Sequence, residues 1–338
     1  MNRCVSLVAL LMALGLVPAQ AGYILIGWNN LGMHCMDSDY SIFSILPPYN
    51  TIQAQLIGPS GQLVKNPGAI KVTYEAITDA SGSINTTSVG KSGFWKYSAA
   101  LYGAALAADA GLAGTSMPGS KNAPQPTLFD AARWVFGGEG IPITPYDDEG
   151  VKNFYPMMRL VARDGAGVVL ASTDIVLPVS DEMSCRACHS SFSQDTAKPA
   201  AGWVNQADGE RDYRLNVLRL HDEREQGNAK FTLALAAMSY SSAGLYATVT
   251  QDSKPVLCAG CHLSNALPGT GQAGIKPLTE ATHGLHAGVV LPGTSTTLDA
   301  VGNRAACYSC HPGSITRCLR GVMGNAVSSG GTVEIQCQ

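Results

Sequence analysis

Three times in this chain, two cysteines separated by two residues are followed directly by a histidine. The three motifs are Cys185-Arg186-Ala187-Cys188-His189, Cys258-Ala259-Gly260-Cys261-His262 and Cys307-Tyr308-Ser309-Cys310-His311. This CxxCH spacing is the attachment signature of c-type haem, in which two thiols bond to one porphyrin and the adjacent imidazole binds its iron. The sequence therefore predicts three covalently attached haems.

Zinc binding and thiol redox chemistry are the alternative uses of CxxC pairs. Tandem CxxC pairs build tetrahedral zinc sites, but such sites do not need a histidine directly after the second cysteine. Three pairs also give an awkward number of ligands for four-cysteine sites. A redox dithiol normally has one motif near a βαβ pattern, and this chain shows no such pattern. Covalent haem is the favoured interpretation.

The ligand on the second face of each iron would decide what the haems do. His189, His262 and His311 are the predicted proximal ligands. A second histidine or a methionine closes the iron for electron transfer, whereas an empty position admits a substrate. Four other histidines are available for three positions, which favours bis-histidine haems, and methionines are weaker candidates. These candidate distal ligands are His34, His221, His283, His286, Met33 and Met36.

The first 21 residues have the three parts of a secretory signal peptide. A positive start that includes Arg3 precedes an apolar run at 5–17, and Ala19-Gln20-Ala21 supplies small residues before a cleavage point. The apolar run is shorter than the roughly 20 residues that a membrane-spanning helix needs. We expect an exported protein that is periplasmic, extracellular or associated with the outer membrane, with no transmembrane segment in the mature chain.

Charge and composition argue against a nucleic-acid partner. Loss of Arg3 with the signal leaves 21 basic against 25 acidic residues, and no run of lysine and arginine stands out. Charged residues make up 14% of the chain, where a typical soluble domain has about 25%. This shortage fits a protein that buries cofactors or protein surface.

The predicted secondary structure changes at about residue 180. Residues 22–180 contain strand-like runs at 23–26, 51–57 and 71–77, and a predicted hairpin at 157–162 and 168–177 around Asp164-Gly165. Helices are expected within 94–112, 212–225 and 230–245. The predicted fold is mixed. A signal peptide at 1–21 precedes a β-rich, sandwich-like non-haem domain at 22–180 and a coil and helix multihaem c-type domain at 181–338.

Three further segments resemble a known family. They are NNLGMHCMD at 29–37, FSILPPYN at 43–50, and PVSDEMS at 178–184, which leads into the first CxxCH motif. Together with the motifs they resemble a largely uncharacterised family of exported bacterial multihaem c-type cytochromes with a non-haem N-terminal region. The resemblance covers most of the chain. It implies electron transfer in or beyond the periplasm of anaerobically respiring bacteria, with other cytochromes as redox partners.

The end of the chain leaves two interpretations open. The last two residues, Cys337 and Gln338, could begin a fourth CxxCH motif that is incomplete here. Alternatively, Cys337 pairs with Cys318 in a disulfide, which an exported protein permits.

The sequence is compatible with three functions. The first is an electron-transfer cytochrome, in which no residue is catalytic. The second is a multihaem reductase with one open haem that acts on a small oxyanion or a nitrogen or sulfur compound. No cluster of polar residues for such a substrate stands out, although Arg186, Arg304 and Tyr308 lie close to the motifs and Arg317 lies somewhat further away. The third is a structural subunit of a cytochrome assembly or filament, in which the β-rich region mediates oligomerisation.

Overall fold

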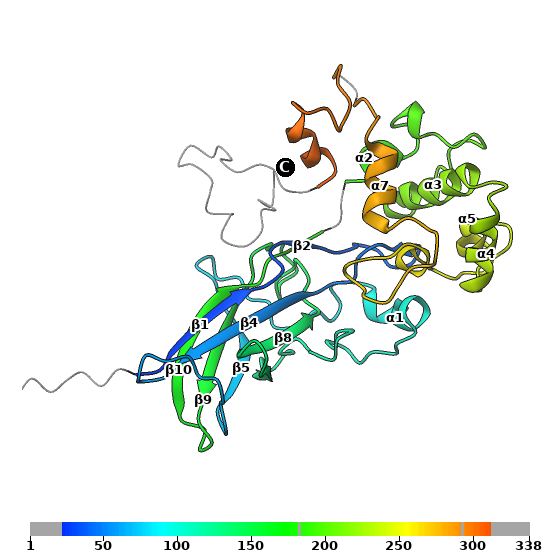
Figure 1. The fold of residues 1–338 in the computed structure, drawn as a ribbon. Coiled ribbons are helices and arrows are strands. Elements are labelled where there is room, and N and C mark those ends of the chain that lie inside the picture. Colours follow the sequence, from blue (N-terminus) through cyan, green and yellow to red (C-terminus); the bar gives the residue numbers. More distant parts are fainter. Residues whose placement is uncertain (1–21, 182–183, 292–293, 312–338) are drawn as a thin grey trace, which may run out of the picture.

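The computed structural model describes residues 22–181, 184–291 and 294–311 (Figure 1). The predicted signal peptide, Arg317, Cys318 and Cys337 lie outside these residues. Two parts are visible. Strands dominate the chain before residue 181, and helices dominate it after residue 184.

Two four-stranded antiparallel sheets form the N-terminal part. The first has the strand order β1-β4-β8-β7, and comprises β1 (Ile24–Asn29), β4 (Asn50–Ile57), β8 (Val135–Ile141) and β7 (Leu128–Asp130). The second has the order β10-β9-β5-β6, and comprises β10 (Val169–Val176), β9 (Met157–Arg163), β5 (Lys71–Ile77) and β6 (Gln125–Pro126).

Alternation of side chains explains how these strands build a core. Val72, Tyr74 and Ala76 on β5 are buried and alternate with partly exposed residues, as a period of two requires. They share one hydrophobic cluster with buried residues of β4, β8 and β9. The strands predicted at 51–57 and 71–77 are present, and the predicted hairpin is the antiparallel pair β9 and β10.

The helix expected within 94–112 is shorter than predicted. The helix α1 spans Phe94–Tyr102 and ends because Gly103 adopts a left-handed φ of 68°. Apolar spacing continues beyond this glycine, which is why the pattern alone overestimated the length. The helix expected within 230–245 is also shorter, since α4 spans Ala229–Ala237.

A glycine lets the edge strand β1 approach the second sheet. A Cβ atom on Gly27 would lie 2.8 Å from Leu160 Cδ1 on β9 and 3.0 Å from Thr173 Cγ2 on β10. Such contacts are too short for any larger residue without movement of the neighbours. Figure 1 shows β1 beside β10 at this edge, so the two sheets meet closely there.

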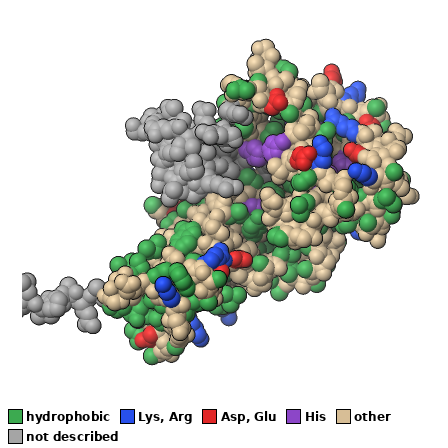
Figure 2. Space-filling view, viewed as in Figure 1, with side chains coloured by type: hydrophobic (Ala, Val, Ile, Leu, Met, Phe, Trp, Pro, Cys, Tyr) green, Lys and Arg blue, Asp and Glu red, His purple; other side chains and the backbone are tan. Residues whose placement is uncertain are grey.

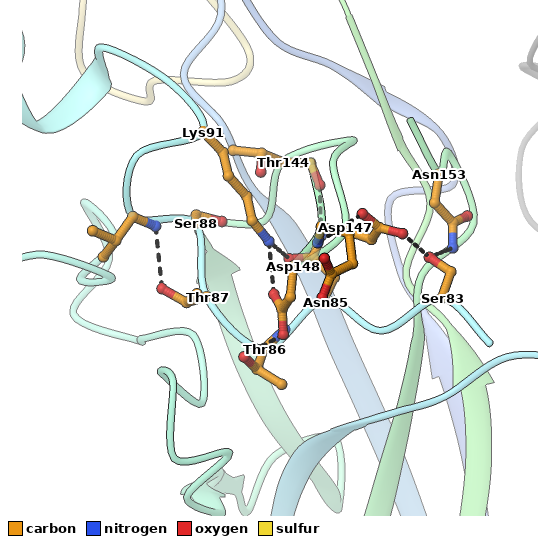
Figure 3. Close-up of polar contacts among 12 residues, drawn as sticks. Ser83, Asn85, Thr86, Thr87, Ser88, Lys91, Thr144, Asp147, Asp148 and Asn153 are labelled. Carbon is orange, nitrogen blue, oxygen red and sulfur yellow. Dashed lines mark hydrogen bonds and ion pairs between the residues drawn. The ribbon is translucent and has the colours of Figure 1, made fainter. Parts of the chain in front are cut away.

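A polar network ties together two loops of the N-terminal part (Figure 3). The Lys91 ammonium donates to Asn85 Oδ1 and pairs with Asp148 Oδ1, both at 2.9 Å. Asp148 also accepts a hydrogen bond from the Thr86 hydroxyl at 2.7 Å. Asp147 accepts from the backbone N–H groups of Glu149 and Val151. These carboxylates are engaged in holding the loops.

Helices form most of the C-terminal part. They are α2 (Arg186–His189), α3 (Gly209–Arg224), α4, α5 (Leu245–Thr250), α6 (Cys258–Cys261) and α7 (Leu278–His286), with short 3₁₀ turns η1 (Asp195–Ala197) and η2 (Arg304–Ser309). The Asp208 side chain caps α3 by accepting from the N–H groups of Glu210 and Arg211. Among the described helices, none combines the length and apolar composition that crossing a membrane requires.

Two short parallel strand pairs lie close to the motifs in sequence, and the second of them joins the two parts. β2 (His34–Cys35) pairs with β11 (Val179–Ser180), a few residues before the first CxxCH motif. β3 (Phe43–Ser44) pairs with β12 (Val256–Leu257), which leads directly into Cys258. Phe43 lies in the hydrophobic cluster of the helical part, whereas Leu257 and Ala259 lie in that of the sheets. The second motif is therefore wedged between the two cores.

Candidate functional site

Each CxxCH motif folds as a single helical turn. The backbone N–H of the histidine donates to the carbonyl of the first cysteine of its motif. The nitrogen to oxygen distances are 3.0 Å for His189 and Cys185, 2.9 Å for His262 and Cys258, and 2.9 Å for His311 and Cys307. In such a turn, residues three and four positions apart share a face. Both thiols and the imidazole of a motif therefore emerge on one side, and the six cysteines are all partly buried.

The structure pairs each motif histidine with one histidine from outside the motifs. The ring centroids are 6.3 Å apart for His189 and His286, 6.3 Å for His221 and His262, and 6.1 Å for His283 and His311. The ring planes are nearly perpendicular in the first two pairs, at 82°, and close to parallel in the third, at 21°. Three of the four spare histidines are used, one for each motif.

These separations match two imidazoles on opposite sides of one metal ion. A histidine nitrogen binds a metal at about 2.0 Å, and in a five-membered ring with bonds of about 1.33 Å it lies about 1.1 Å from the centroid. Two such rings across one ion therefore have centroids about 6 Å apart. Packed aromatic rings also occur at about 4.5–7 Å. What distinguishes these pairs is that every one joins a motif histidine to a histidine from elsewhere.

Backbone carbonyls orient three of the six rings. The Nδ1 atoms of His262, His283 and His286 lie 2.8, 2.8 and 2.7 Å from the carbonyl oxygens of Lys276, Thr279 and Thr282. A carbonyl only accepts, so each Nδ1 carries the proton and donates it. The Nε2 lone pair is then left for a ligand, which is the usual arrangement of a metal-binding histidine.

Burial keeps the other rings neutral. Burial, and then the charges of His286 and Arg224, lower the pKa of His189 to about 4. The pKa values of His221 and His311 are also lowered, in both cases chiefly by burial. The Nδ1 atoms of His189 and His221 are buried and have no hydrogen-bond partner among the described residues. Neutral imidazole is the form that binds a metal.

Two helices connect the three pairs. His283 and His286 lie three residues apart on α7, and so on one face, yet they face two different motifs. The backbone N–H of Ser184 donates to the carbonyl of Cys310 at 2.9 Å, which places the first and third motifs side by side. On α3, Asn216 Nδ2 donates to the carbonyl of His189 at 3.0 Å, and His221 faces the second motif. The first pair thus neighbours both others.

Apolar side chains lie exposed beside the histidine pairs. Phe192, three residues after His189, is 74% exposed, and Leu285, between His283 and His286, is 57% exposed. Leu263, directly after His262, is 44% exposed. Figure 2 shows histidine side chains at the surface of the helical part. Uncovered apolar groups beside paired imidazoles suit a large, flat, mostly apolar group such as a porphyrin.

His34 is the spare histidine that the structure does not pair with a motif. It is buried on β2, and its Nε2 lies 2.7 Å from the carbonyl oxygen of Pro47. Its ring contacts Tyr49 with centroids 3.9 Å apart. Burial lowers the pKa of His34 to about 4, opposed by the hydrogen bond to Pro47. The interpretation of His34 as a distal ligand does not match this position, in which Nε2 is already occupied.

The methionine candidates receive no support as ligands. Met36 is 1% exposed and belongs to the hydrophobic cluster of the sheets, which is ordinary core packing. Met33, three residues earlier, is half-buried.

The arrangement also bears on the zinc alternative. Within the described ranges, no group of three or more histidine, cysteine or acidic side chains converges to hold a metal ion. Each pair offers two imidazoles, whereas a structural zinc site takes four protein ligands. The residues present fit a metal that brings its own equatorial ligands, as a porphyrin iron does.

Two polar residues singled out near the motifs have partners in the structure. Arg186 forms an ion pair with Glu210 at 2.5 Å. Tyr308 also has an interaction partner. Neither residue therefore stands out as a substrate-binding group.

The N-terminal part contributes residues that sequence reasoning missed. Asp37, fully buried, accepts hydrogen bonds through Oδ2 from the Ser44 hydroxyl and from the N–H groups of Ile45 and Leu46. These bonds hold β3, and β3 holds β12 next to Cys258. Asp37 lies within the segment at 29–37 that carries the family resemblance, so the resemblance was the signal that could have pointed to it.

Comparisons with known proteins found no match among protein-family models, curated proteins or solved structures.

Proposed function

We propose that this protein is a multihaem c-type cytochrome with three complete attachment sites, and that it transfers electrons. The observation that carries the proposal is the pairing of every CxxCH histidine with one other histidine at about the spacing of two imidazoles on one metal. Chance packing does not explain why the three partners serve three different motifs.

The residues that would hold each haem follow from the pairs. Each group below gives two cysteines for covalent attachment, then the motif histidine, then its partner. The first is Cys185, Cys188, His189 and His286; the second is Cys258, Cys261, His262 and His221; the third is Cys307, Cys310, His311 and His283. When bound, haem iron supplies a one-electron ferric and ferrous couple.

Two imidazoles per iron support electron transfer over substrate reduction. A histidine on each face leaves no axial position for a small substrate, so the chain's residues space the sites and adjust their potentials. Because the first pair neighbours both others, the order in space would be third, first, second, which differs from the order in sequence. A reductase with one open haem, or a structural subunit of an assembly, remains the alternative function.

The cellular setting belongs to the same proposal. The predicted signal peptide and the family resemblance support a role in the periplasm or outside the cell, with other cytochromes as electron donors and acceptors. Covalent haem attachment and export are commonly linked, and the signal at 1–21 agrees with that link.

Replacing the spare histidines one at a time tests the proposal. The protein is produced in a host that attaches c-type haem, and its mass and absorption and magnetic resonance spectra are measured. We expect three covalent haems, all low-spin. Each of His221→Ala, His283→Ala and His286→Ala should turn one haem of the three high-spin, because one axial ligand is lost.

His34→Gln is the matched control, because it replaces the one spare histidine that faces no motif. All three haems should stay low-spin in this variant. Absence of covalent haem from the unmutated protein would contradict the whole proposal. High-spin iron that responds to carbon monoxide in the unmutated protein would instead favour the reductase.

A further inference from the structure

The three histidines that face the motifs are not all held in the same way. On α7, the Nδ1 atoms of His283 and His286 donate to the carbonyl oxygens of Thr279 and Thr282. On α3, the Nδ1 atom of His221 is buried and has no hydrogen-bond partner among the described residues. A metal-binding imidazole is usually oriented through its second nitrogen. The ring of His221 therefore needs another restraint.

The acids that follow His221 in sequence do not supply this restraint. Asp222 accepts from the first two backbone N–H groups of α5, Glu223 from N–H groups in the chain before α3, and Glu225 from the side chain that caps α4. Each carboxylate is engaged with another part of the helical region. A carboxylate bonded to the imidazole, the other common way to orient a ligand histidine, is therefore absent among the described residues.

An aromatic ring from the neighbouring helix lies against His221 instead. The centroids of the Phe231 ring, on α4, and the His221 ring are 5.3 Å apart, and the ring planes are inclined by 53°. This separation is typical of packed aromatic pairs. Phe231 is half-buried and packs against the hydrophobic cluster of the helical part, which includes Leu218 of α3 and Leu235 of α4. The two helices thus share one cluster, which fixes the Phe231 ring beside the imidazole.

We propose that Phe231 is a positioning residue for the second haem site, and that its ring holds His221 in place of a hydrogen bond. This inference rests on the proposed function, because it requires iron between His221 and His262. Phe231 is not a ligand. It restricts rotation of the His221 ring, whose plane lies at 82° to that of His262. The second site is consequently the one that opens most readily when packing is weakened.

Removal of the ring tests the proposal in the haem-loaded, full-length protein. Phe231→Ala should keep three covalent haems, with one of them partly high-spin and accessible to carbon monoxide. Carbon monoxide should bind this haem about tenfold faster than in the unmutated protein, the size expected from the loss of one aromatic contact. Magnetic resonance should locate the change in the haem that His221→Ala turns high-spin. In a chain that already carries His221→Ala, Phe231→Ala should add no further change.

Two other variants separate the effect of the ring from that of general packing. Phe231→Tyr keeps the ring and should leave all three haems low-spin and closed to carbon monoxide. Phe231→Leu keeps an apolar side chain for the hydrophobic cluster but has no ring, so it should speed carbon monoxide binding in the same direction as Phe231→Ala. The leucine variant gives the answer even if the alanine variant does not accumulate as folded protein.

The matched control is Phe129→Ala, which truncates a half-buried phenylalanine of β7 in the first sheet. Phe129 contacts Phe136 with ring centroids 4.9 Å apart. All three haems should stay low-spin in this variant. The inference is overturned if Phe231→Ala leaves spin state and carbon monoxide binding unchanged, if it opens the first or third haem, or if the control opens a haem as well. Absence of covalent haem from the unmutated protein would instead refute the proposed function on which the inference rests.

Discussion

The β-rich part and the helical part of this protein fill their interiors in different ways. In the β-rich part, side chains such as Ile52, Tyr74 and Leu160 are fully buried against one another and close a continuous core. In the helical part, three pairs of imidazoles face each other at about 6 Å, and apolar side chains beside them lie exposed. Both parts have a hydrophobic cluster of their own, but only the helical part places exposed apolar side chains beside paired imidazoles.

This difference indicates that the β-rich part supports the helical part. The β-rich part contains β2, which pairs with β11 a few residues before the first motif, and β3, which pairs with β12 directly before the second. A core that closes without a cofactor can act as a fixed frame for histidines that must face each other accurately. We therefore expect the two parts to respond differently to the loss of haem and to mutation.

The largest expected effect comes from preventing haem attachment. In a variant with all six motif cysteines replaced by serine, amides of β4, β5 and β9 should remain protected from hydrogen exchange. Amides of α3 and α7 should exchange at least about a hundredfold faster than in the loaded protein, because their packing depends on the missing group. Hydrogen exchange with mass spectrometry measures both. Equal loss of protection in the two parts would contradict the expectation that only the helical part depends on haem.

Two leucines test the same contrast by truncation. Leu160→Ala, at a fully buried position in the sheets, should lower the free energy of unfolding by about 2–5 kcal/mol whether or not haem is attached. Leu285→Ala, at a position 57% exposed on α7, should change little in the haem-free protein. It should loosen α7 in the loaded protein, where a porphyrin would cover the side chain. Urea unfolding of both forms measures these effects, and a Leu285 effect independent of haem would contradict the expectation.

The buried His34 should make the stability of the β-rich part sensitive to acid. Its folded pKa of about 4 lies below the usual value of 6.5, so the neutral form is favoured in the folded protein. Its stabilising contribution is complete above pH 6.5 and is lost as the pH falls toward 4, by up to about 3 kcal/mol.

His34→Gln should abolish this part of the pH dependence, because glutamine does not titrate. Unfolding of both proteins at pH 7 and at pH 4 gives the difference directly. If the two proteins lose the same stability between these pH values, His34 does not titrate as described.

The smallest expected effects compare the loss of an exposed ion pair with the loss of a buried carboxylate. Asp174→Asn removes an exposed pair with Arg159 on the β9 and β10 hairpin and should cost less than about 1 kcal/mol. Asp212→Asn weakens a 5% exposed carboxylate that accepts from the N–H and hydroxyl of Ser191 and from the N–H of Gln206. It should cost about 1–3 kcal/mol, because a buried donor loses its acceptor. Thermal unfolding of the two variants ranks them, and the reverse order would contradict the burial argument.

Local patterns predicted local structure well in this chain. The alternation at 71–77 and the Asp164-Gly165 turn predicted β5 and the β9 and β10 hairpin, because both depend on neighbouring residues. The prediction of α1 overran Gly103, since apolar spacing does not register a left-handed backbone. For the candidate site, the sequence offered four spare histidines as distal ligands, and the structure brings three of them opposite a motif. The expectation for His34 did not match the structure, because nothing near His34 in sequence shows that the Pro47 carbonyl occupies its Nε2.

The sequence by itself determined the chemistry that each motif can offer. Cysteines and histidine within five residues fold into one helical turn, whose hydrogen bond from the histidine N–H back to the first cysteine is local. Only the tertiary structure decided which histidine faces which motif, and that α7 serves two of them. Those relations join residues far apart in the chain, so no local pattern of the sequence determines them.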